Sequence, residues 1–345
     1  MSTLVVTSIG PASSVQDGGR FGAQRYGLTP SGAMDKLSLA AANSLVGNAP
    51  LAAAIEIGPF GAAFTAKGGA VRVALAGAPR PADIAKRPVE LNTSVTLADG
   101  ETLTLGFARG GSFSYLAIEG GIEGEATFGS LSVNARAGLG SPYPRPLQSG
   151  DSFITKTASE APERRITLPA TQSGPIRVVL GPQDNEFTDE MKALFLDSDW
   201  KISATSDRMG YRLEGPAIQH LHGHNIVSDG TVDGSIQITG SGAPIVLMVD
   251  RGTSGGYPKL ATVITADFGR LAQTPAGTAF RFKAVSMAEA QAEARKFKDL
   301  LQSLPDHVSD IETMELRHEA LMTANVAGHA VSATDAATWH AAARD

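Results

Sequence analysis

The sequence predicts a mainly β fold with some α-helix, and three observations support this. The 345 residues include 38 glycines and 19 prolines, about one residue in six, which favours many turns and short strands. Segments rich in β-branched residues recur through about the first 285 residues and end at glycine or polar turns. Helical periodicity is confined to a few stretches. This spacing predicts barrels or sandwiches rather than alternating strands and helices.

The predicted strands begin near the N-terminus. Leu4–Ile9 opens with β-branched residues and is stopped by Gly10 and Pro11. Further strands are predicted at Val71–Leu75, Ser94–Leu97, Thr102–Leu105 and Tyr115–Ile118. Much later, Pro175–Pro182 echoes the opening pattern: a strand ends in Gly-Pro and is followed by Gln-Asp within a few residues. The echo is weak evidence that both halves of the chain begin alike.

Helices are predicted at three places. Lys36–Val46 carries apolar residues at helical spacing and is followed by a Gly-Asn pair, which is typical of a helix end. Asp189–Leu196 is the second. The third is an amphipathic helix from Met287 to about Ser303, and the tail from Pro305 onward is predicted to be further helix.

The domain organisation follows from length and composition. A chain of 345 residues favours two domains of about 150 residues. Between Thr157 and Ser173 the composition shifts to Ala, Pro, Glu, Arg and Thr, and Pro162 and Pro169 are expected to block regular structure there. We therefore predict domains at residues 1–158 and 174–286, joined by this linker, and a helical tail at 287–345.

Several classes of protein are excluded by composition. The net charge of −6 leaves no basic footprint for nucleic acid and disfavours anionic membrane surfaces. The absence of cysteine excludes disulfide scaffolds, thiolate catalysis and Cys-ligated metals. No apolar run approaches the ~18 residues of a membrane span, and the N-terminus lacks the pattern of a signal peptide. A cytoplasmic protein is expected.

Two local motifs are candidates for sites. Gly252–Gly256 fits the nucleophile-elbow pattern, but Tyr257 and Pro258 follow where a helix must start, so a serine hydrolase is disfavoured. His220–His224 places three histidines at alternate positions, which is the sharpest candidate for a metal. Because this spacing does not impose a coordination geometry, we interpret it as a turn bent at Gly223 and predict no metal site.

Three loops contain the highest density of charged and polar side chains. Gln16–Arg20 combines a carboxylate, two glycines and a guanidinium, and Ser206–Arg212 holds two guanidiniums beside Asp207. Asp250–Lys259 follows the apolar segment Ile245–Val249 and presents charges, hydroxyls and a further Gly-Gly pair. Any one Asp–Arg pair could simply close a turn. Three such loops favour a polar pocket that handles anions.

The same loops belong to a longer ordered series of stretches between about residues 4 and 285. The series consists of Val15–Arg20, Ser31–Asp35, Ala42-Asn43, Val46–Asn48, Glu56-Ile57, Leu116–Gly121, Gly129-Ser130, Arg136–Gly140, Ser206–Gly215, Ser228–Gly230, Gly234–Gln237, Asp250–Lys259, Asp267 and Gln273. In these stretches the sequence resembles the family of the C subunit of bacterial 5-oxoprolinase, also called allophanate hydrolase subunit 2 or biotin-dependent carboxyltransferase.

The resemblance implies two domains, each with a cyclophilin-like β-barrel. It also implies a subunit-B-like partner, a third oxoprolinase subunit, and ATP-driven opening of the lactam of 5-oxoproline to glutamate. The chain departs from the family at Leu131, where arginine is usual, at Gly252, where glutamine is usual, and at Ser141–Pro146, where the family is glycine-rich. The expected substrate is therefore 5-oxoproline or a related cyclic amide. The expected role is that of a subunit inactive alone, with ATP bound by the complex.

Site residues follow from the loops and the resemblance together. Cations neutralise the developing charge in such a reaction, and carboxylates position water or accept a proton. The predicted catalytic residues are Asp207, Arg208, Tyr257 and Lys259, and the predicted substrate-binding residues are Asp17, Arg20, Arg212, Gln237, Asp250, Arg251 and Thr253. Gln237 alternates with apolar neighbours in its strand. We expect it to converge with the four catalytic residues on one pocket in the second domain.

Two alternatives remain open. The first is the carboxyltransferase component of a biotin-dependent urea carboxylase or allophanate hydrolase system. Because the sequence has no Met-Lys-Met biotinylation site, biotin would have to arrive on another chain. The second is a non-catalytic regulatory subunit that binds and inhibits a partner, which the intact set of polar loops disfavours. The neighbouring genes would discriminate between these possibilities.

Overall fold

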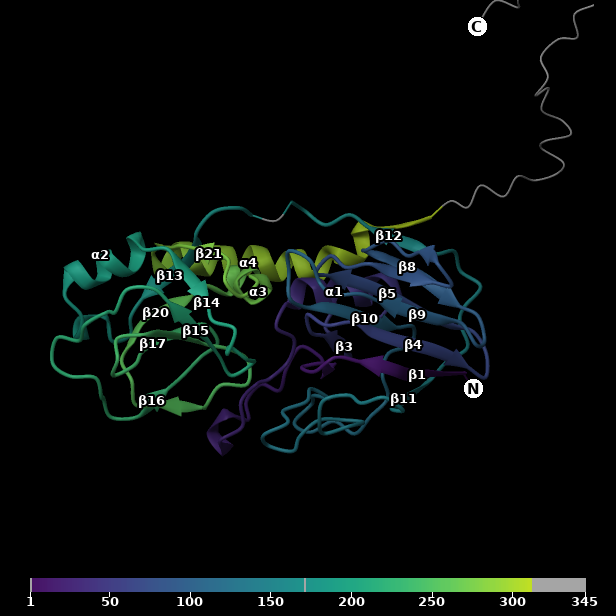
Figure 1. The fold of residues 1–345 in the computed structure, drawn as a ribbon, viewed down its shortest axis with the longest axis horizontal. Coiled ribbons are helices and arrows are strands. Elements are labelled where there is room, and N and C mark those ends of the chain that lie inside the picture. The colour runs from purple at the N-terminus through teal and green to yellow at the C-terminus, as the bar shows by residue number, and fades with distance from the viewer. Residues whose placement is uncertain (1, 171, 312–345) are drawn as a thin grey trace, which may run out of the picture. The chain divides into compact units, whose positions relative to one another are not determined.

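Three large β-sheets form the framework of the computed structural model, which describes residues 2–170 and 172–311 (Figure 1). The mainly β fold is confirmed, and the chain up to Asp310 forms one compact unit. The predicted division into domains at residues 158 and 174 stays a prediction. In the described part of the chain, no helix is long and apolar enough to cross a membrane.

The first two sheets are built almost entirely from the first half of the chain. One has the order β11-β1-β4-β9-β6-β7 and the other the order β2-β3-β10-β5-β8-β12-β23. Their bounds are β1 Ser2–Ile9, β2 Ser14–Gln16, β3 Ala54–Ile57, β4 Ala62–Lys67, β5 Val71–Gly77, β6 Ala82–Ile84, β7 Arg87–Pro88, β8 Thr93–Leu97, β9 Thr102–Leu105, β10 Ser114–Ile118, β11 Ser152–Thr155, β12 Arg164–Ile166 and β23 Val308–Asp310. The five strands predicted in this half are all confirmed.

These two sheets share one apolar core. Alternate residues of β1 and β4, such as Leu4 and Phe64, are fully buried in the same cluster as Val73 of β5 and Leu116 of β10. This alternation of buried and less buried positions is what a sheet with one face on a core requires.

The third sheet comes from the second half and nearly closes on itself. Its order is β21-β14-β15-β18-β17-β20-β13-β22, and only the β13–β22 pair is parallel. The bounds are β13 Ile176–Leu180, β14 Trp200–Ile202, β15 Gly210–Glu214, β17 Ser235–Ile238, β18 Pro244–Leu247, β20 Lys259–Val263, β21 Ala279–Phe280 and β22 Phe282–Ala284, with a separate small pair of β16 Asp229–Gly230 and β19 Ser254–Gly255.

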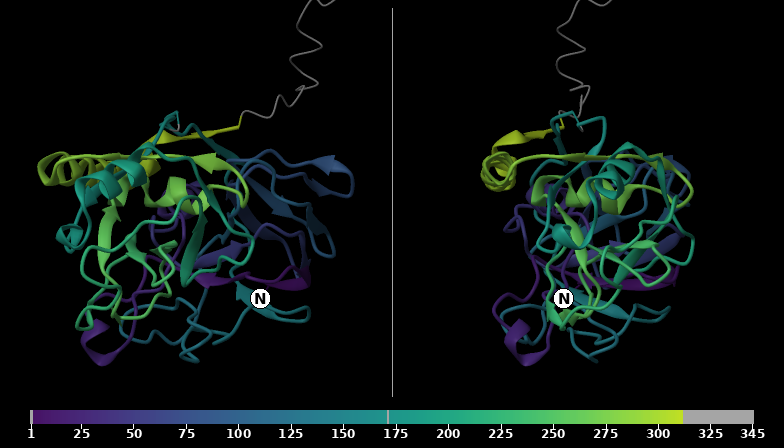
Figure 2. Two further views of the ribbon diagram at one scale, coloured as in Figure 1. Left: turned by 60° about the vertical axis from the view of Figure 1, so that its left-hand side comes forward. Right: turned by 90° about the vertical axis from the view of Figure 1, so that its left-hand side faces the viewer.

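Two of the predicted helices begin at clear caps. The Asp35 carboxylate accepts hydrogen bonds from the backbone N–H groups of Leu37 and Ser38 at the start of α1 (Lys36–Leu45). A capping box of Ser286 and Glu289 starts α4 (Met287–Ser303). The third predicted helix is also present, as α2 (Asp189–Asp197). Helix α4 lies against α3 and β13 (Figures 1 and 2).

One helix was missed, and two expectations need correction. The sequence did not predict α3 (Thr265–Gln273), and the proline-rich segment expected to lack regular structure contains β12. The tail is not helical directly after Pro305: a 3-10 turn (Leu304–His307) leads into β23, which pairs with β12. In the last two cases the pairing partner is remote in sequence, so local composition does not reveal it. The rest of the predicted helical tail lies outside the described residues.

Candidate functional site

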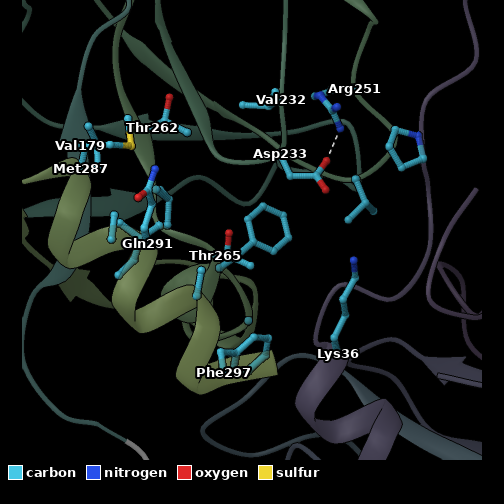
Figure 3. A pocket seen from close by; sticks show the side chains of 18 of the residues that line it. Lys36, Val179, Val232, Asp233, Arg251, Thr262, Thr265, Met287, Gln291 and Phe297 are labelled. Atoms are coloured by element: carbon cyan, nitrogen blue, oxygen red, sulfur yellow. Dashed lines mark hydrogen bonds and ion pairs between the residues drawn. The ribbon is translucent and has the colours of Figure 1, made fainter. Parts of the chain in front are cut away.

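A cavity of about 800 Å³ lies between the start of α1, strands β13 and β20, and helices α3 and α4 (Figure 3). Most of its wall is apolar, with Met34 before α1, Val179 on β13, Phe268 on α3 and Phe297 on α4. Its charged lining residues are Lys36, Asp233 and Arg251, and its uncharged polar ones are Gln24, Thr262, Thr265 and Gln291. A largely apolar pocket with a few convergent polar groups is the usual form of a small-molecule site.

Lys36 brings an ammonium group to this cavity from the first turn of α1. Its Nζ lies 4.9 Å from the centroid of the Phe21 ring, and the described part of the chain gives it no carboxylate within 4.0 Å. Burial lowers the pKa of Lys36, while the nearby carboxylates of Asp233 and Asp17 act in the opposite direction. Lys36 is therefore a cation placed to receive an anionic group.

Arg251 and Asp233 form an ion pair on the side of the cavity that also carries Lys36 (Figure 3). The Arg251 guanidinium also donates to the Oγ1 of Thr231 at 3.2 Å and to its carbonyl oxygen at 3.3 Å. Burial raises the pKa of Asp233, and Arg251 opposes this shift. With Lys36, the three charged residues leave the cavity with one net positive charge.

Gln24 holds the backbone near Asp233 and Arg251. Its Nε2 donates to the carbonyl oxygens of Thr231 and Thr253 at 2.9 and 3.1 Å. Of the predicted substrate-binding residues, Arg251 thus lines the cavity. Thr253 contributes a backbone acceptor to its surroundings.

A second polar cluster surrounds Lys259 on β20. The Lys259 side chain is 2% exposed, and its Nζ lies 3.0 Å from Oδ2 of Asp229, which is 54% exposed. Gln183 donates to the same carboxylate at 3.1 Å and accepts from the Lys259 backbone N–H at 3.0 Å. Hydrogen bonds from Lys259 and then Gln183 lower the pKa of Asp229. A buried ammonium therefore reaches a solvent-facing carboxylate.

Gln237 and Tyr257 lie in the same region as Lys259. Gln237 is the register partner of Lys259 on the adjacent strand β17, and its Nε2 donates to the Tyr257 carbonyl oxygen at 3.4 Å. The Tyr257 side chain is 37% exposed. Gln237, Tyr257 and Lys259, three of the five residues expected to converge on one pocket, are therefore neighbours.

A third cluster joins the two halves of the chain around Arg208. The guanidinium donates to Oδ2 of Asp250 at 2.8 Å and to the Gly32 carbonyl oxygen at 2.9 Å, and it ion-pairs with Glu56 on β3. Together Asp250 and Glu56 hold the pKa of Arg208 above its usual value, although burial acts to lower it. Its donors are therefore engaged within the protein.

Glu56 is fully buried, and its other contacts complete this cluster. Its Oε2 accepts hydrogen bonds from the Tyr115 hydroxyl at 2.6 Å and from the Met34 backbone N–H at 2.8 Å. Burial raises the pKa of Glu56, and Arg208 opposes this shift most strongly. Each oxygen of the carboxylate thus accepts at least one hydrogen bond, as a buried charge needs.

Asp207 and Arg212 have different surroundings from Arg208. Asp207 closes a tight turn, since its Oδ1 accepts from the backbone N–H groups of Met209 and Gly210 at 2.8 and 3.2 Å. Arg212 is an exposed residue of β15.

Asp17 and Arg20 form a fourth cluster with the loop at residues 130–132. The Asp17 carboxylate accepts from the Ser130 hydroxyl and the Leu131 backbone N–H, both at 2.7 Å. The Arg20 side chain is buried and donates to the Ser132 carbonyl oxygen. Burial lowers the pKa of Arg20, and Asp17 opposes this shift. Neither residue lines the cavity.

The predicted site residues are thus distributed over several clusters, and Arg208 and Lys259 pair with different carboxylates. Their convergence on one pocket and their catalytic roles stay predictions. Sequence reasoning gave no role to Lys36, Asp233 or Glu56. Glu56 lay in a stretch that carried the family resemblance, whereas nothing in the local sequence marked Lys36 beyond its place after a helix cap.

The histidine segment has ordinary packing contacts. The ring of His220 lies 5.2 Å from that of Phe187, and its Nε2 is 3.1 Å from the Ile238 carbonyl oxygen. Within residues 2–170 and 172–311, no three His, Cys, Asp or Glu side chains are grouped to hold a metal ion.

The chain is similar to several known proteins. A family model described as carboxyltransferase domain, subdomain A and B, matches residues 26–284. The C subunit of the Escherichia coli 5-oxoprolinase is 36% identical over 304 residues, which cover 86% of this chain and 97% of that protein. The corresponding C subunit of the Haemophilus influenzae 5-oxoprolinase is 34% identical over 82% of this chain and 92% of its own length.

A solved structure is also similar. The crystal structure of the K. lactis urea amidolyase matches with a TM-score of 0.79 and 26% identity. The match covers 86% of this chain but only 20% of that much longer chain.

Proposed function

The chain belongs to the carboxyltransferase subdomain A and B family, and from that premise we propose that it is a subunit of an ATP-dependent amidohydrolase. The proposed reaction opens the lactam of 5-oxoproline, or of a related cyclic amide, to glutamate together with a subunit-B-like partner and a third subunit. Relatives named as the C subunit of 5-oxoprolinase, aligned over nearly their whole length, support this proposal.

The observation that carries the proposal is the cavity with one net positive charge. A cyclic amide of this class bears a carboxylate, and the Lys36 ammonium, which has no ionic partner within residues 2–170 and 172–311, is placed to receive it, with Arg251 beside it. Charge-assisted hydrogen bonds of this kind fix both the position and the orientation of an acid. The apolar wall then packs against the ring.

We propose that Tyr257 and Lys259 act on the lactam once a partner completes the site. Neither Tyr257 nor Lys259 is among the residues that line the cavity, but Gly181 and Pro182 are, and the next residue, Gln183, accepts a hydrogen bond from the Lys259 backbone N–H. A cation at this position would neutralise negative charge that develops on the amide oxygen. Arg208 we assign to positioning, because its donors are engaged with Asp250, Glu56 and Gly32. A role in the reaction for Asp207 stays a prediction.

ATP would supply a phosphoryl group that activates the amide towards attack by water. The described lining residues do not fit a triphosphate, because Lys36 and Arg251 are the only cations among them and Arg251 is already paired with Asp233. We therefore propose that ATP is bound elsewhere in the complex, and we assign it no step here.

The carboxyltransferase alternative is favoured by the similarity to a urea amidolyase structure. In that case biotin would be carried on another chain, and urea or a similar amide would accept the carboxyl group. The same charged loops would then serve a different acceptor.

The purified single chain is expected to be inactive, because a partner completes the site. The assay is ADP release by the chain alone and by the chain co-purified with the products of its neighbouring genes, with 5-oxoproline, urea or allophanate. We expect ATP turnover in the complex that depends on 5-oxoproline. Turnover by the single chain would contradict the need for a partner, and turnover only with urea and a biotin carrier would favour the alternative.

A further inference from the structure

The cavity is larger than 5-oxoproline requires. Its volume of about 800 Å³ lies in the upper part of the ~300–1,000 Å³ range of pockets that hold drug-sized ligands. 5-Oxoproline is one small ring with a carboxylate, and it fills only a minor part of that space. The remaining volume is available to another part of a ligand.

The wall of the cavity is divided by chemistry. Figure 3 shows the charged side chains of Lys36, Asp233 and Arg251 on one side and Val179 of β13 and Met287 of α4 on the other, where Thr262 and Gln291 add uncharged polar groups. The charged side carries one net positive charge, because Asp233 pairs with Arg251 whereas Lys36 has no ionic partner in the described part of the chain. A matching ligand has one negative end and one apolar end.

The helix α4 supplies much of the apolar side, and it follows the segment matched by the family model, which ends at residue 284. The α4 side chains in the wall are Met287, Ala290, Gln291, Ala294 and Phe297. Met287 is 59% exposed, so this side borders solvent and does not strictly limit the length of a ligand.

We propose that the cavity binds an amphipathic monocarboxylate, whose carboxylate meets Lys36 while its apolar chain or ring system lies against α4. The identity of the reacting group in this ligand rests on the proposed function. Under it, the substrate class is a 5-oxoproline-like acid that carries an apolar substituent, and free 5-oxoproline is the minimal member of the class.

Calorimetric titration of the single chain tests this directly, with decanoate, decylamine, 1-decanol and 5-oxoproline as probes. Decanoate is expected to bind at least about tenfold more tightly than each of the others, a difference of ~1.4 kcal/mol. Lys36→Met is expected to lower decanoate affinity by at least about tenfold, and Lys36→Arg is expected to retain it. Ala294→Phe fills part of the apolar side and is expected to weaken decanoate binding more than 5-oxoproline binding.

Two results would overturn the inference: binding of decanoate no tighter than that of 1-decanol, or decanoate affinity unchanged in both Lys36→Met and Ala294→Phe. Circular dichroism of each variant confirms that it is folded. The binding test uses the chain alone, so it is separate from turnover by the complex. Turnover of 5-oxoproline without decanoate binding refutes only the inference, whereas decanoate binding without any 5-oxoproline turnover refutes only the proposed reaction.

Discussion

Replacement of Arg208 by alanine is expected to lower the free energy of unfolding by about 3–5 kcal/mol, the usual cost of breaking a buried ion pair on one side. The reason is Glu56, which is fully buried and would lose its only ionic partner in the described part of the chain. The hydrogen bonds from Tyr115 and Met34 remain, but they do not neutralise the charge. Urea unfolding followed by circular dichroism measures the effect.

The same loop offers a matched control. Arg212→Ala removes an exposed guanidinium four residues away, and we expect it to change stability by no more than about 0.5 kcal/mol. The double variant Arg208→Ala/Glu56→Gln removes the stranded charge and is expected to recover part of the loss. An Arg208→Ala variant no less stable than Arg212→Ala would show that the cluster does not hold the two halves together.

Replacement of Lys259 by methionine is expected to lower kcat/KM of the assembled complex by at least about tenfold, or ~1.4 kcal/mol of transition-state stabilisation. Methionine keeps much of the volume of the buried side chain and removes only the ammonium. The melting temperature is expected to stay nearly unchanged, because Asp229 is 54% exposed and its carboxylate can be hydrated once it is unpaired.

Lys259→Ala separates charge from packing. It removes the same charge and also opens a void, so it should match the methionine variant in activity but be less stable. Asp229→Asn, which leaves the ammonium in place, is the control for loss of the ion pair itself. Full activity of the Lys259→Met complex would contradict a catalytic role for this residue.

Much of the fold could be predicted because the signals were local. The strand Thr102–Leu105 is bounded by turn residues, and α1 begins at the Asp35 cap and ends before a Gly-Asn pair. Helix α3 was missed because its identity depends on packing. Gly269 of this helix lies so close to Asp35 that a Cβ atom at position 269 would approach Oδ1 of Asp35 to 2.9 Å. In the local sequence, however, a glycine inside a short segment argues against a helix.

The candidate site was predicted less completely, since its partners are remote in sequence. The charged loops marked Arg208 and Arg251 as candidates, but the chain around Arg208 says nothing of Glu56, 152 residues away. Lys36 sits at the start of a helix where a lysine is usually a solvated residue, and only the folding of β13, β20 and α4 around it makes a cavity.

The most direct test of the proposed function is the product balance of the assembled complex. Labelled 5-oxoproline is incubated with ATP and the complex, and glutamate and ADP are quantified together. The proposed function predicts that glutamate forms in proportion to ADP and that neither forms when this chain is left out. Glutamate formation that proceeds equally well without this chain, or ADP release without any glutamate, would contradict it.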